Sequence, residues 1–241
     1  MNSEKILVTI CNYNHNQYLK ESIESIQNQS YENLDICIYD DGSEKQEEFL
    51  EIIEKVNKDS RIRTILSKNN RGKWFGLNEA IRTTDAKICT SHDADDISLK
   101  NRIERQLNCL KTTNTAHNLC GFYHCWNEDD IIKYKKHEYS ENLIVIDSKS
   151  VYNLVVQGFN HPGINHYYTG NFETAGTSAM FYKQIWDAGI RFNPPNMGLR
   201  ITHSEDSDFN LRSTILTQST SILAEKVYLY RRETSTNREE T

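Results

Sequence analysis

The chain has 241 residues, enough for one large α/β domain or two small ones with a substantial buried core. A formal net charge of −6 and a pI near 5.8 argue against a general nucleic-acid binder, because phosphate recognition needs a basic face. No apolar run approaches the length of a membrane span and no signal-peptide pattern is visible, so we expect no transmembrane segment. The six cysteines form no CxxC pair, which predicts buried free thiols in a reducing cytoplasm rather than a zinc site or disulfide framework.

The first 125 residues alternate strand and helix signals. Short apolar runs predict strands at Ile6 to Cys11, Leu34 to Tyr39, Arg63 to Leu66 and Ala86 to Cys89. Apolar residues at helical spacing predict the intervening and following helices, at Leu19/Ile23/Ile26, Phe49/Ile52/Ile53/Val56, Leu77/Ala80/Ile81 and Ile103/Leu107/Leu110. Repeated strand–helix units predict a mostly parallel central sheet with helices on both faces.

From about Asp129 the pattern becomes less regular. Gly158 to Gly176 is rich in Gly, His, Asn and Tyr without clear periodicity, which suggests a binding loop. The other expected elements are strands at Ile131 to Tyr134, Leu143 to Ile146, Thr177 to Tyr182 and Ile222 to Tyr230, and helices at Val151 to Val156, around Ile185, Trp186 and Ile190, and at Glu205 to Leu211. No internal repeat or linker separates two independent domains.

The stretch Ser91-His92-Asp93-Ala94-Asp95-Asp96 follows the fourth predicted strand. Three carboxylates within four residues repel one another, and burying them without a partner is costly. Mg²⁺ or Mn²⁺ relieves that repulsion, because these cations prefer oxygen ligands and complete their shells with water and substrate phosphates. The alternative interpretation is a solvated loop in which Asp96 or Ser98 caps the next helix. The stretch alone leaves both interpretations open.

Polar clusters follow three of the predicted strands, at Asn12-Tyr13-Asn14, Asp40-Asp41 and Asp93 to Asp96. In parallel α/β sheets, ligands bind beyond the carboxyl ends of the strands. The convergence of the three clusters at such ends therefore indicates a ligand site more strongly than any one of them.

Five segments of the chain carry a family resemblance. They are Val8-Thr9-Ile10-Cys11-Asn12-Tyr13-Asn14, Tyr39-Asp40-Asp41-Gly42-Ser43, Asn70-Arg71-Gly72-Lys73 with Leu77-Asn78-Glu79-Ala80, His92-Asp93-Ala94-Asp95-Asp96, and Ser204-Glu205-Asp206-Ser207-Asp208. In this order and spacing they resemble the inverting, nucleotide-sugar-dependent glycosyltransferases of family 2, which have the GT-A fold. One departure is Cys11, where the family often has Pro. The resemblance implies a single GT-A-like domain over residues 1–241, with a Rossmann-like nucleotide-sugar-binding half at 1–128 and an acceptor-binding and catalytic-base half at 129–241.

The donor side of the site follows from the same resemblance. It implies that the Thr9 backbone and Tyr13 lie near the base and ribose, although an aromatic is as often a core residue as a contact. Asp41 matches the family's uracil contact, which favours UDP or dTDP, while the Asp-Gly pair is also turn chemistry. Arg71 or Lys73 is available to the diphosphate, a position where a basic residue is otherwise simply solvated.

The acidic run corresponds to the family's DxD pair. The resemblance makes Asp95 the ligand of the Mn²⁺ or Mg²⁺ that bridges the phosphates, and places Asp93 on the ribose or on the water shell of the metal. Such a metal acts as a Lewis acid for the departing nucleoside diphosphate. Asp96 is expected to cap the following helix, and His92 to be a structural hydrogen-bonding residue.

The second acidic cluster supplies the base in this interpretation. Inverting transfer needs one group that takes the proton of the acceptor hydroxyl, and Asp206 matches the family's base. Glu205 and Asp208 are the alternatives, because three acids in four residues make an error of one position easy. The cluster also fits a charged helix start stabilised by the helix dipole.

The acceptor side is less defined. Gly176 and Thr177 begin a stretch that resembles the acceptor-lining segment of the family. His161, His166, Tyr167 and Tyr168 lie where acceptor specificity varies, and Tyr230-Arg231-Arg232 resembles the family's C-terminal segment, in which an arginine such as Arg231 reaches the diphosphate.

The resemblance predicts metal-dependent inverting transfer of a sugar from a nucleotide donor, with UDP-sugars favoured, to a hydroxyl of a saccharide or lipid-linked glycan. We expect a cytoplasmic protein, with peripheral association at the inner face of the membrane compatible with a lipid-linked acceptor. The alternatives are a nucleotide-sugar or glycan-binding module without catalysis and a sugar-nucleotide pyrophosphorylase. The latter requires a Gly-rich phosphate loop with a basic residue after the first strand, and Cys11 to Asn16 has neither.

Overall fold

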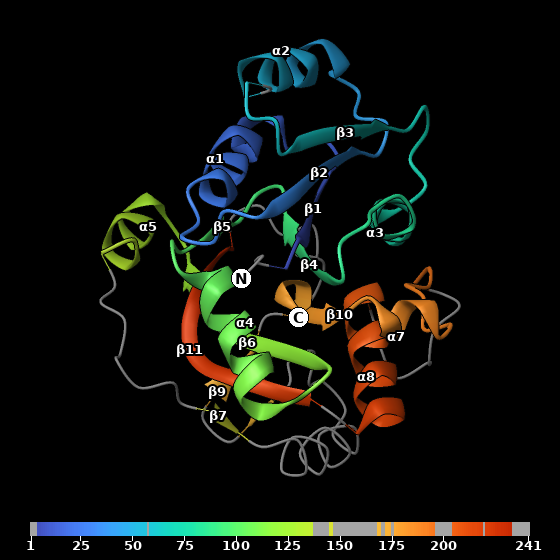
Figure 1. Ribbon diagram of the computed structural model, residues 1–241. Coiled ribbons are helices and arrows are strands. Elements are labelled where there is room, and N and C mark those ends of the chain that lie inside the picture. The colour runs from blue at the N-terminus through green and yellow to red at the C-terminus, as the bar shows by residue number, and fades with distance from the viewer. Residues whose placement is uncertain are drawn as a thin grey trace.

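The computed structural model describes residues 4–56, 58–136, 145–146, 168–169, 172–174, 176–195, 204–218 and 220–232. These residues form one α/β unit with a central sheet and helices packed on it (Figure 1). The sheet has nine strands in the order β3-β2-β1-β4-β10-β6-β11-β5, and β7 pairs separately with β11. A small second sheet consists of β8 and β9.

The strands are β1 Ile6–Asn12, β2 Leu34–Asp40, β3 Ile62–Leu66, β4 Ile88–Asp93, β5 Ile97–Ser98, β6 His117–Cys125, β7 Val145–Ile146, β8 Tyr168–Thr169, β9 Phe172–Glu173, β10 Met180–Tyr182 and β11 Thr220–Arg231. The helices are α1 Asn16–Gln27, α2 Gln46–Val56, α3 Lys73–Arg82, α4 Arg102–Thr113, α5 Glu128–Tyr134, α7 Gln184–Asp187 and α8 Glu205–Thr217, and η1 Gly176–Ser178 is a 3₁₀ turn.

The direction of the strands places the polar clusters at one edge of the sheet. β1 pairs in parallel with β2 and β4, and β2 pairs in parallel with β3. β10 runs antiparallel to both β4 and β6, and β6 pairs in parallel with β11. The strands β1 to β4, β6 and β11 therefore point the same way, so the chain leaves each of them at the same edge.

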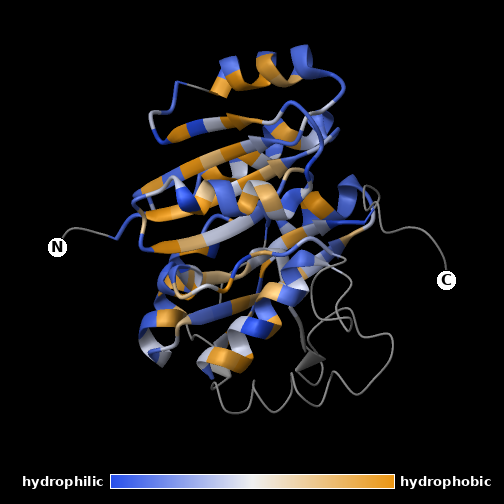
Figure 2. Cartoon of the chain, turned by 90° about the vertical axis from the view of Figure 1, so that its right-hand side faces the viewer, coloured by the Kyte–Doolittle hydropathy of each residue, from blue (hydrophilic) through white to orange (hydrophobic). Residues whose placement is uncertain are grey.

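Helices cover both faces of the sheet because the strands alternate their side chains between two cores. Ile6, Val8 and Ile10 of β1 pack with residues of α1, α2 and α4. Leu7 of the same strand packs in a second core with residues of α3, α7 and α8, among them Phe209. Hydrophobic residues accordingly concentrate along the stacked strands in the middle of the molecule (Figure 2). The predicted mostly parallel sheet with helices on both faces is confirmed.

The predicted strand at Ile131 to Tyr134 is wrong, because this segment lies in α5. Asn127 caps the helix, its side chain accepting a hydrogen bond from the backbone N–H of Asp130. Three acidic residues in the first turn stabilise the helix, because their negative charges lie at the positive end of the helix dipole. Only Ile131 of the helix is buried, so the pair Ile131-Ile132 contributes one buried side chain of a surface helix and does not form a strand.

The expected cap of α4 is also wrong. The residue before the helix is Asn101, whose side chain makes no capping bond. Asp96 is instead buried, where one carboxylate oxygen accepts from the hydroxyl of Tyr228 and the other from the backbone N–H of Arg231. Ser98 lies in β5 and accepts from Arg102. The acidic run is therefore attached to the C-terminal strand of the sheet.

β6 was not predicted from the sequence, although it pairs with both β10 and β11. It begins with the polar pair His117-Asn118, which is buried and hydrogen-bonded to other polar side chains. The predicted strand at Thr177 to Tyr182 is correct only from Met180, because the residues before it form η1. Val151 to Val156 and most of Gly158 to Gly176 lie outside the described residues. In the part of the chain that is described, no helix is long and apolar enough to cross a membrane.

Candidate functional site

The carboxyl ends of β1, β2 and β4 form the floor of the candidate site. Asn12 ends β1, and its side-chain amide donates to Asp40 at the end of β2. Ser43 joins the same cluster, bonding Asp40 and accepting from the backbone N–H of Asn14. These bonds fix the two strand ends against each other, and β4 brings Asp93 to the same edge beside Cys11.

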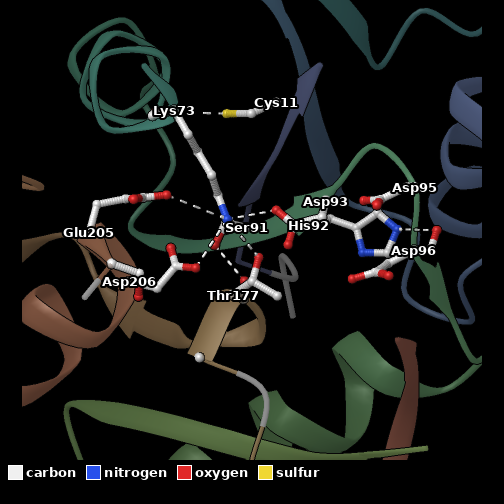
Figure 3. A network of polar contacts seen from close by, with 12 residues as sticks. Cys11, Lys73, Ser91, His92, Asp93, Asp95, Asp96, Thr177, Glu205 and Asp206 are labelled. Carbon is white, nitrogen blue, oxygen red and sulfur yellow. Dashed lines mark hydrogen bonds and ion pairs between the residues drawn. The ribbon is translucent and has the colours of Figure 1, made fainter. Parts of the chain in front are cut away.

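Lys73 lies at the centre of the site (Figure 3). Its ammonium nitrogen is 2.6 Å from Oδ1 of Asp93 and 3.1 Å from Oδ2 of Asp206. It also lies 3.9 Å from Glu205 and donates to the hydroxyl of Thr177 at 3.2 Å. One lysine thereby joins four residues from β4, η1 and α8 that are distant in sequence.

The position of Lys73 is set by the loop that precedes it. Asp41 accepts hydrogen bonds of 2.8 Å from the backbone N–H groups of Arg71 and Gly72. Gly72 has a φ of 92°, a conformation that a side chain disfavours, and Lys73 follows as the first residue of α3. Through these two hydrogen bonds, the Asp41 carboxylate fixes the start of α3.

α3 packs unusually close to β2. A side-chain carbon at Gly76 would come within 2.1 Å of the Tyr39 ring, so only glycine allows this approach. The hydroxyl of Tyr39 donates to Asp41 at 2.8 Å, which ties the packing of the helix to the loop below it.

The charges around Lys73 perturb its pKa and that of Asp206. Burial lowers the pKa of Lys73, but the charges of Asp206, Asp93 and Glu205 outweigh burial and hold it well above its usual value. Burial raises the pKa of Asp206 to about 7, against the opposing effect of the Lys73 charge. A carboxyl group that titrates near neutral pH is suited to proton transfer.

The three acids at the start of α8 have different surroundings. Ser204 caps the helix, its hydroxyl accepting from the backbone N–H of Ser207. Asp206 and Glu205 face Lys73, whereas Asp208 is turned away and accepts from Arg212 at 2.9 Å. Oδ1 of Asp206 is buried and has no hydrogen-bond partner among the residues that the structure describes. Of the three acids, Asp206 therefore has the free buried oxygen that a base requires.

The acids at the end of β4 and just after it also have different partners. Asp93 is bound to Lys73, and Asp95 lies 3.3 Å from Nδ1 of His15 at the start of α1. The hydrogen bond to Asp95 raises the pKa of His15. Burial raises the pKa of Asp96 well above its usual value, and its oxygens are engaged by β11.

Asp93 and Asp95 suit a divalent cation that takes further ligands from water and a substrate. Within the described residues no group of three or more His, Cys, Asp or Glu side chains is arranged to hold a metal. The positively charged Lys73 ammonium group already lies against Asp93, and the same ammonium group contacts Asp206. Two carboxylates close together in sequence supply the oxygen ligands that Mg²⁺ or Mn²⁺ prefers, and such an ion would complete its shell with water and phosphates.

The two residues that the sequence predicted on the acceptor side lie next to Asp206. A side-chain carbon at Gly176 would lie 3.5 Å from Cβ of Asp206, and the Gly176 carbonyl accepts from Asn210 of α8. The hydroxyl of Ser91 donates to the Thr177 carbonyl, which attaches η1 to β4. The structure therefore brings Gly176 and Thr177 beside Asp206 and Lys73.

Four other predicted residues lie around this centre. Thr9 is buried in β1 and paired on both sides, and Tyr13 is 41% exposed just after that strand. The Arg71 guanidinium lies 3.4 Å from the centre of the Phe75 ring and does not join the acids. Arg231 is buried, and its guanidinium pairs with Glu21 and Glu128.

A buried polar network under the acidic run was not predicted from the sequence. Arg102 is fully buried and donates to Thr90, Ser98, Gln106 and the backbone carbonyls of Ser91 and Ser178. It also lies against Nδ1 of His92, which is buried as well. Burial lowers the pKa of His92 well below its usual value, so this residue is a neutral structural group, as predicted. The sequence feature that could have indicated this network is the pair Arg102 and Gln106, which lie one turn apart on the buried side of α4.

The sequence profile of Glycosyl transferase family 2 matches residues 7–186. The chain belongs to this family. Among the curated relatives, an uncharacterized glycosyltransferase of Haemophilus influenzae is 28% identical over 159 residues, covering 66% of this chain and 59% of the relative. A second from the same organism is 39% identical over 111 residues, covering 46% of this chain and 34% of the relative. The chain thus spans only part of the length of these curated relatives.

Solved structures share the GT-A fold of this family 2 chain. TarS 1-349 of S. aureus in complex with UDP aligns with a TM-score of 0.66 at 16% identity, covering 94% of this chain and 60% of TarS. The mannosyltransferase PcManGT of Pyrobaculum calidifontis, in complex with GDP-Man and Mn²⁺, aligns with a TM-score of 0.66 at 15% identity, covering 98% and 59%. At these identities the likeness concerns the fold, which the sequence had predicted as GT-A.

Proposed function

We propose that this chain transfers a sugar from a nucleotide donor, with UDP-sugars favoured, to a hydroxyl of a saccharide or lipid-linked glycan, with inversion. The observation that carries the proposal is the meeting of Asp93, Asp206 and Lys73 at the carboxyl edge of the sheet. Membership of family 2 supports glycosyl transfer, and the related folds of TarS and PcManGT are known with UDP and with GDP-Man and Mn²⁺.

In this proposal Asp95 and Asp93 hold a Mn²⁺ or Mg²⁺ ion together with the donor diphosphate. The metal would supply Lewis-acid stabilisation of the departing nucleoside diphosphate. His15 lies 3.3 Å from Asp95 and would help to hold that carboxylate in place. Asp96 takes no part, because its oxygens are bound to Tyr228 and to the backbone of Arg231.

The nucleotide lies over the ends of β1 and β2 in this proposal. Tyr13 is exposed beside the site and suits stacking or ribose contact. An ionised carboxylate offers about four lone-pair positions, and Asp41 uses three for Tyr39, Arg71 and Gly72. The remaining position suits a base with an imino donor, such as uracil. Thr9 is buried in β1, the strand that leads to Tyr13, and would support the nucleotide from below.

Asp206 serves as the base that takes the proton from the acceptor hydroxyl. Its unpartnered Oδ1 is available to that proton while Oδ2 faces Lys73. Glu205 is 3.9 Å from Lys73 and adds negative charge beside the base. Gly176 leaves space next to Asp206 because it has no side chain, which suits an approaching hydroxyl. The acceptor half at residues 129–241 would thus supply the base, and the donor half at 1–128 the metal and nucleotide contacts.

The test is a panel of nucleotide sugars screened by thermal unfolding with and without Mn²⁺, followed by a UDP-release assay on the donor that stabilises most. A ligand that binds the native state raises its stability, so the donor should give the largest shift, and only with metal. Asp95→Ala should remove the metal-dependent part of that shift. Binding without UDP release, with water or with any saccharide acceptor, would favour a binding module and contradict the proposal. An Mn²⁺-independent shift would contradict the metal role.

A further inference from the structure

We infer that Lys73 is a built-in cation that competes with the divalent metal for Asp93, so that metal binds tightly only together with a nucleotide diphosphate. The inference rests on the proposed function, because it takes Asp93 to be a metal ligand. Lys73 thereby sets the order in which metal and nucleotide bind at the site.

The geometry of the ammonium group supports this role. Lys73 touches Asp93 at 2.6 Å and Asp206 at 3.1 Å, with Glu205 at 3.9 Å (Figure 3). An ammonium group has three donors, and here they face carboxylates from two sides and the Thr177 hydroxyl. One ammonium group thus stands among three carboxyl groups, those of Asp93, Glu205 and Asp206.

A metal and the ammonium cannot share Asp93 without repulsion. Mg²⁺ lies about 2.1 Å from its oxygen ligands, so a metal on Asp93 would stand only a few ångströms from the Lys73 nitrogen. The site is mostly enclosed, with 22% of the Lys73 side chain exposed and 14% of Asp206, so water screens the two charges weakly. Lys73 must leave Asp93, or the metal must bind weakly.

A diphosphate resolves the conflict by giving the ammonium another partner. Lysine is a strong point-charge donor to phosphate, and its four-carbon stem is flexible. The backbone of Lys73 stays fixed, because Asp41 holds Gly72 and α3 packs on Tyr39. Only the side chain needs to move. When phosphate oxygens accept the hydrogen bonds of the Lys73 ammonium group, Asp93 becomes free to bind the metal. Asp206 then no longer has the positive charge of Lys73 beside it.

The other cations near the acids do not offer the same exchange. His15 contacts Asp95, and Arg231 pairs with Glu21 and Glu128. Arg102 lies beneath the acidic run and bonds hydroxyls and carbonyls. Lys73 is therefore the group that links the metal-binding carboxylate with the base.

The test measures Mn²⁺ binding by the loss of the free-ion EPR signal, with and without UDP, in the unaltered protein and in Lys73→Met. Without UDP, we expect Lys73→Met to bind Mn²⁺ at least about tenfold more tightly, since charges of +1 and +2 about 4 Å apart repel by more than this factor even in water. UDP should tighten Mn²⁺ binding to the unaltered protein by a similar factor and should help the variant much less. Lys68→Met, an exposed lysine on the same loop, is the matched control and should behave like the unaltered protein.

Several results would overturn the inference. Tight Mn²⁺ binding by the unaltered protein without nucleotide does so directly, whether or not any variant folds. Equal affinities of the unaltered protein and Lys73→Met without UDP do so as well, and Lys73→Gln gives a second, milder variant for the same comparison. The gain should disappear in Lys73→Met combined with Asp93→Asn. If Mn²⁺ fails to bind even with UDP, the proposed metal role falls together with the inference; if only the gain is missing, the inference falls alone.

Discussion

Replacing Asp206 by Asn tests the base most sharply, because it keeps the shape of the side chain and removes its ability to take a proton. Oδ1 of Asp206 has no hydrogen-bond partner in the described part of the chain, and burial raises the pKa of the group to about 7. A base with a pKa near the working pH contributes roughly 10² to 10⁴ in rate. This factor corresponds to about 3–5 kcal/mol of the activation barrier. We therefore expect kcat to fall by about that factor while the donor KM stays nearly constant.

Asp208→Asn is the matched control for this experiment. Asp208 is two residues further along the same helix but is bound to Arg212 and Asn193. Its replacement should lower thermal stability and leave the rate per folded molecule within a few-fold. Steady-state UDP release, with folding checked by circular dichroism, measures both variants. A near-normal kcat in Asp206→Asn, or an equal loss in Asp208→Asn, would refute the assignment of the base.

The remaining predictions concern pH, the loop and the buried network. Because the base works only when deprotonated, kcat/KM should rise with pH through about 7 and then level off, and Asp206→Asn should lose this inflection; a flat profile in the unaltered protein would contradict the pKa assignment. Asp41→Asn should speed hydrogen exchange of the Arg71 and Gly72 amides and weaken UDP binding, and unchanged exchange would refute the holding role of Asp41. Gly76→Ala should destabilise the fold by about 1–3 kcal/mol in urea unfolding, because its Cβ would overlap Tyr39; a change below ~0.5 kcal/mol would contradict this. Arg102→Met should cost about 3 kcal/mol or more, since it strands several buried acceptors, and a neutral effect would contradict the structural role.

Much of the N-terminal half of the fold was predictable because its strands are continuous apolar runs. Ile6 to Cys11 and Leu34 to Tyr39 correspond closely to β1 and β2, and the acids that follow strands lie at the predicted edge. β6 escaped prediction because its first residues, His117 and Asn118, are polar and find buried partners only in the folded chain. No local pattern reports such partners.

The site shows the same division between local and distant information. Asp208 could have been separated from Asp206 by sequence alone, because Arg212 follows it by four residues and such pairs meet on a helix. The contact of Lys73 with Asp206 spans 133 residues and arises only from the packing of α3 and α8 at one edge of the sheet. Likewise, the capture of Asp96 by Tyr228 depends on a strand 132 residues away.

The most direct measurement of the central claim is proton NMR of the sugar product that forms from an α-linked nucleotide donor in the presence of Mn²⁺. The donor is the nucleotide sugar that gives the largest thermal shift, and transfer to water replaces the acceptor where none is known. With Asp206 acting on the side opposite the leaving group, the product at the earliest times should be the β-anomer, and no product should form when a chelator removes the metal. An α-anomer as the first product, or equal turnover with chelator, would contradict metal-dependent inverting transfer at this site.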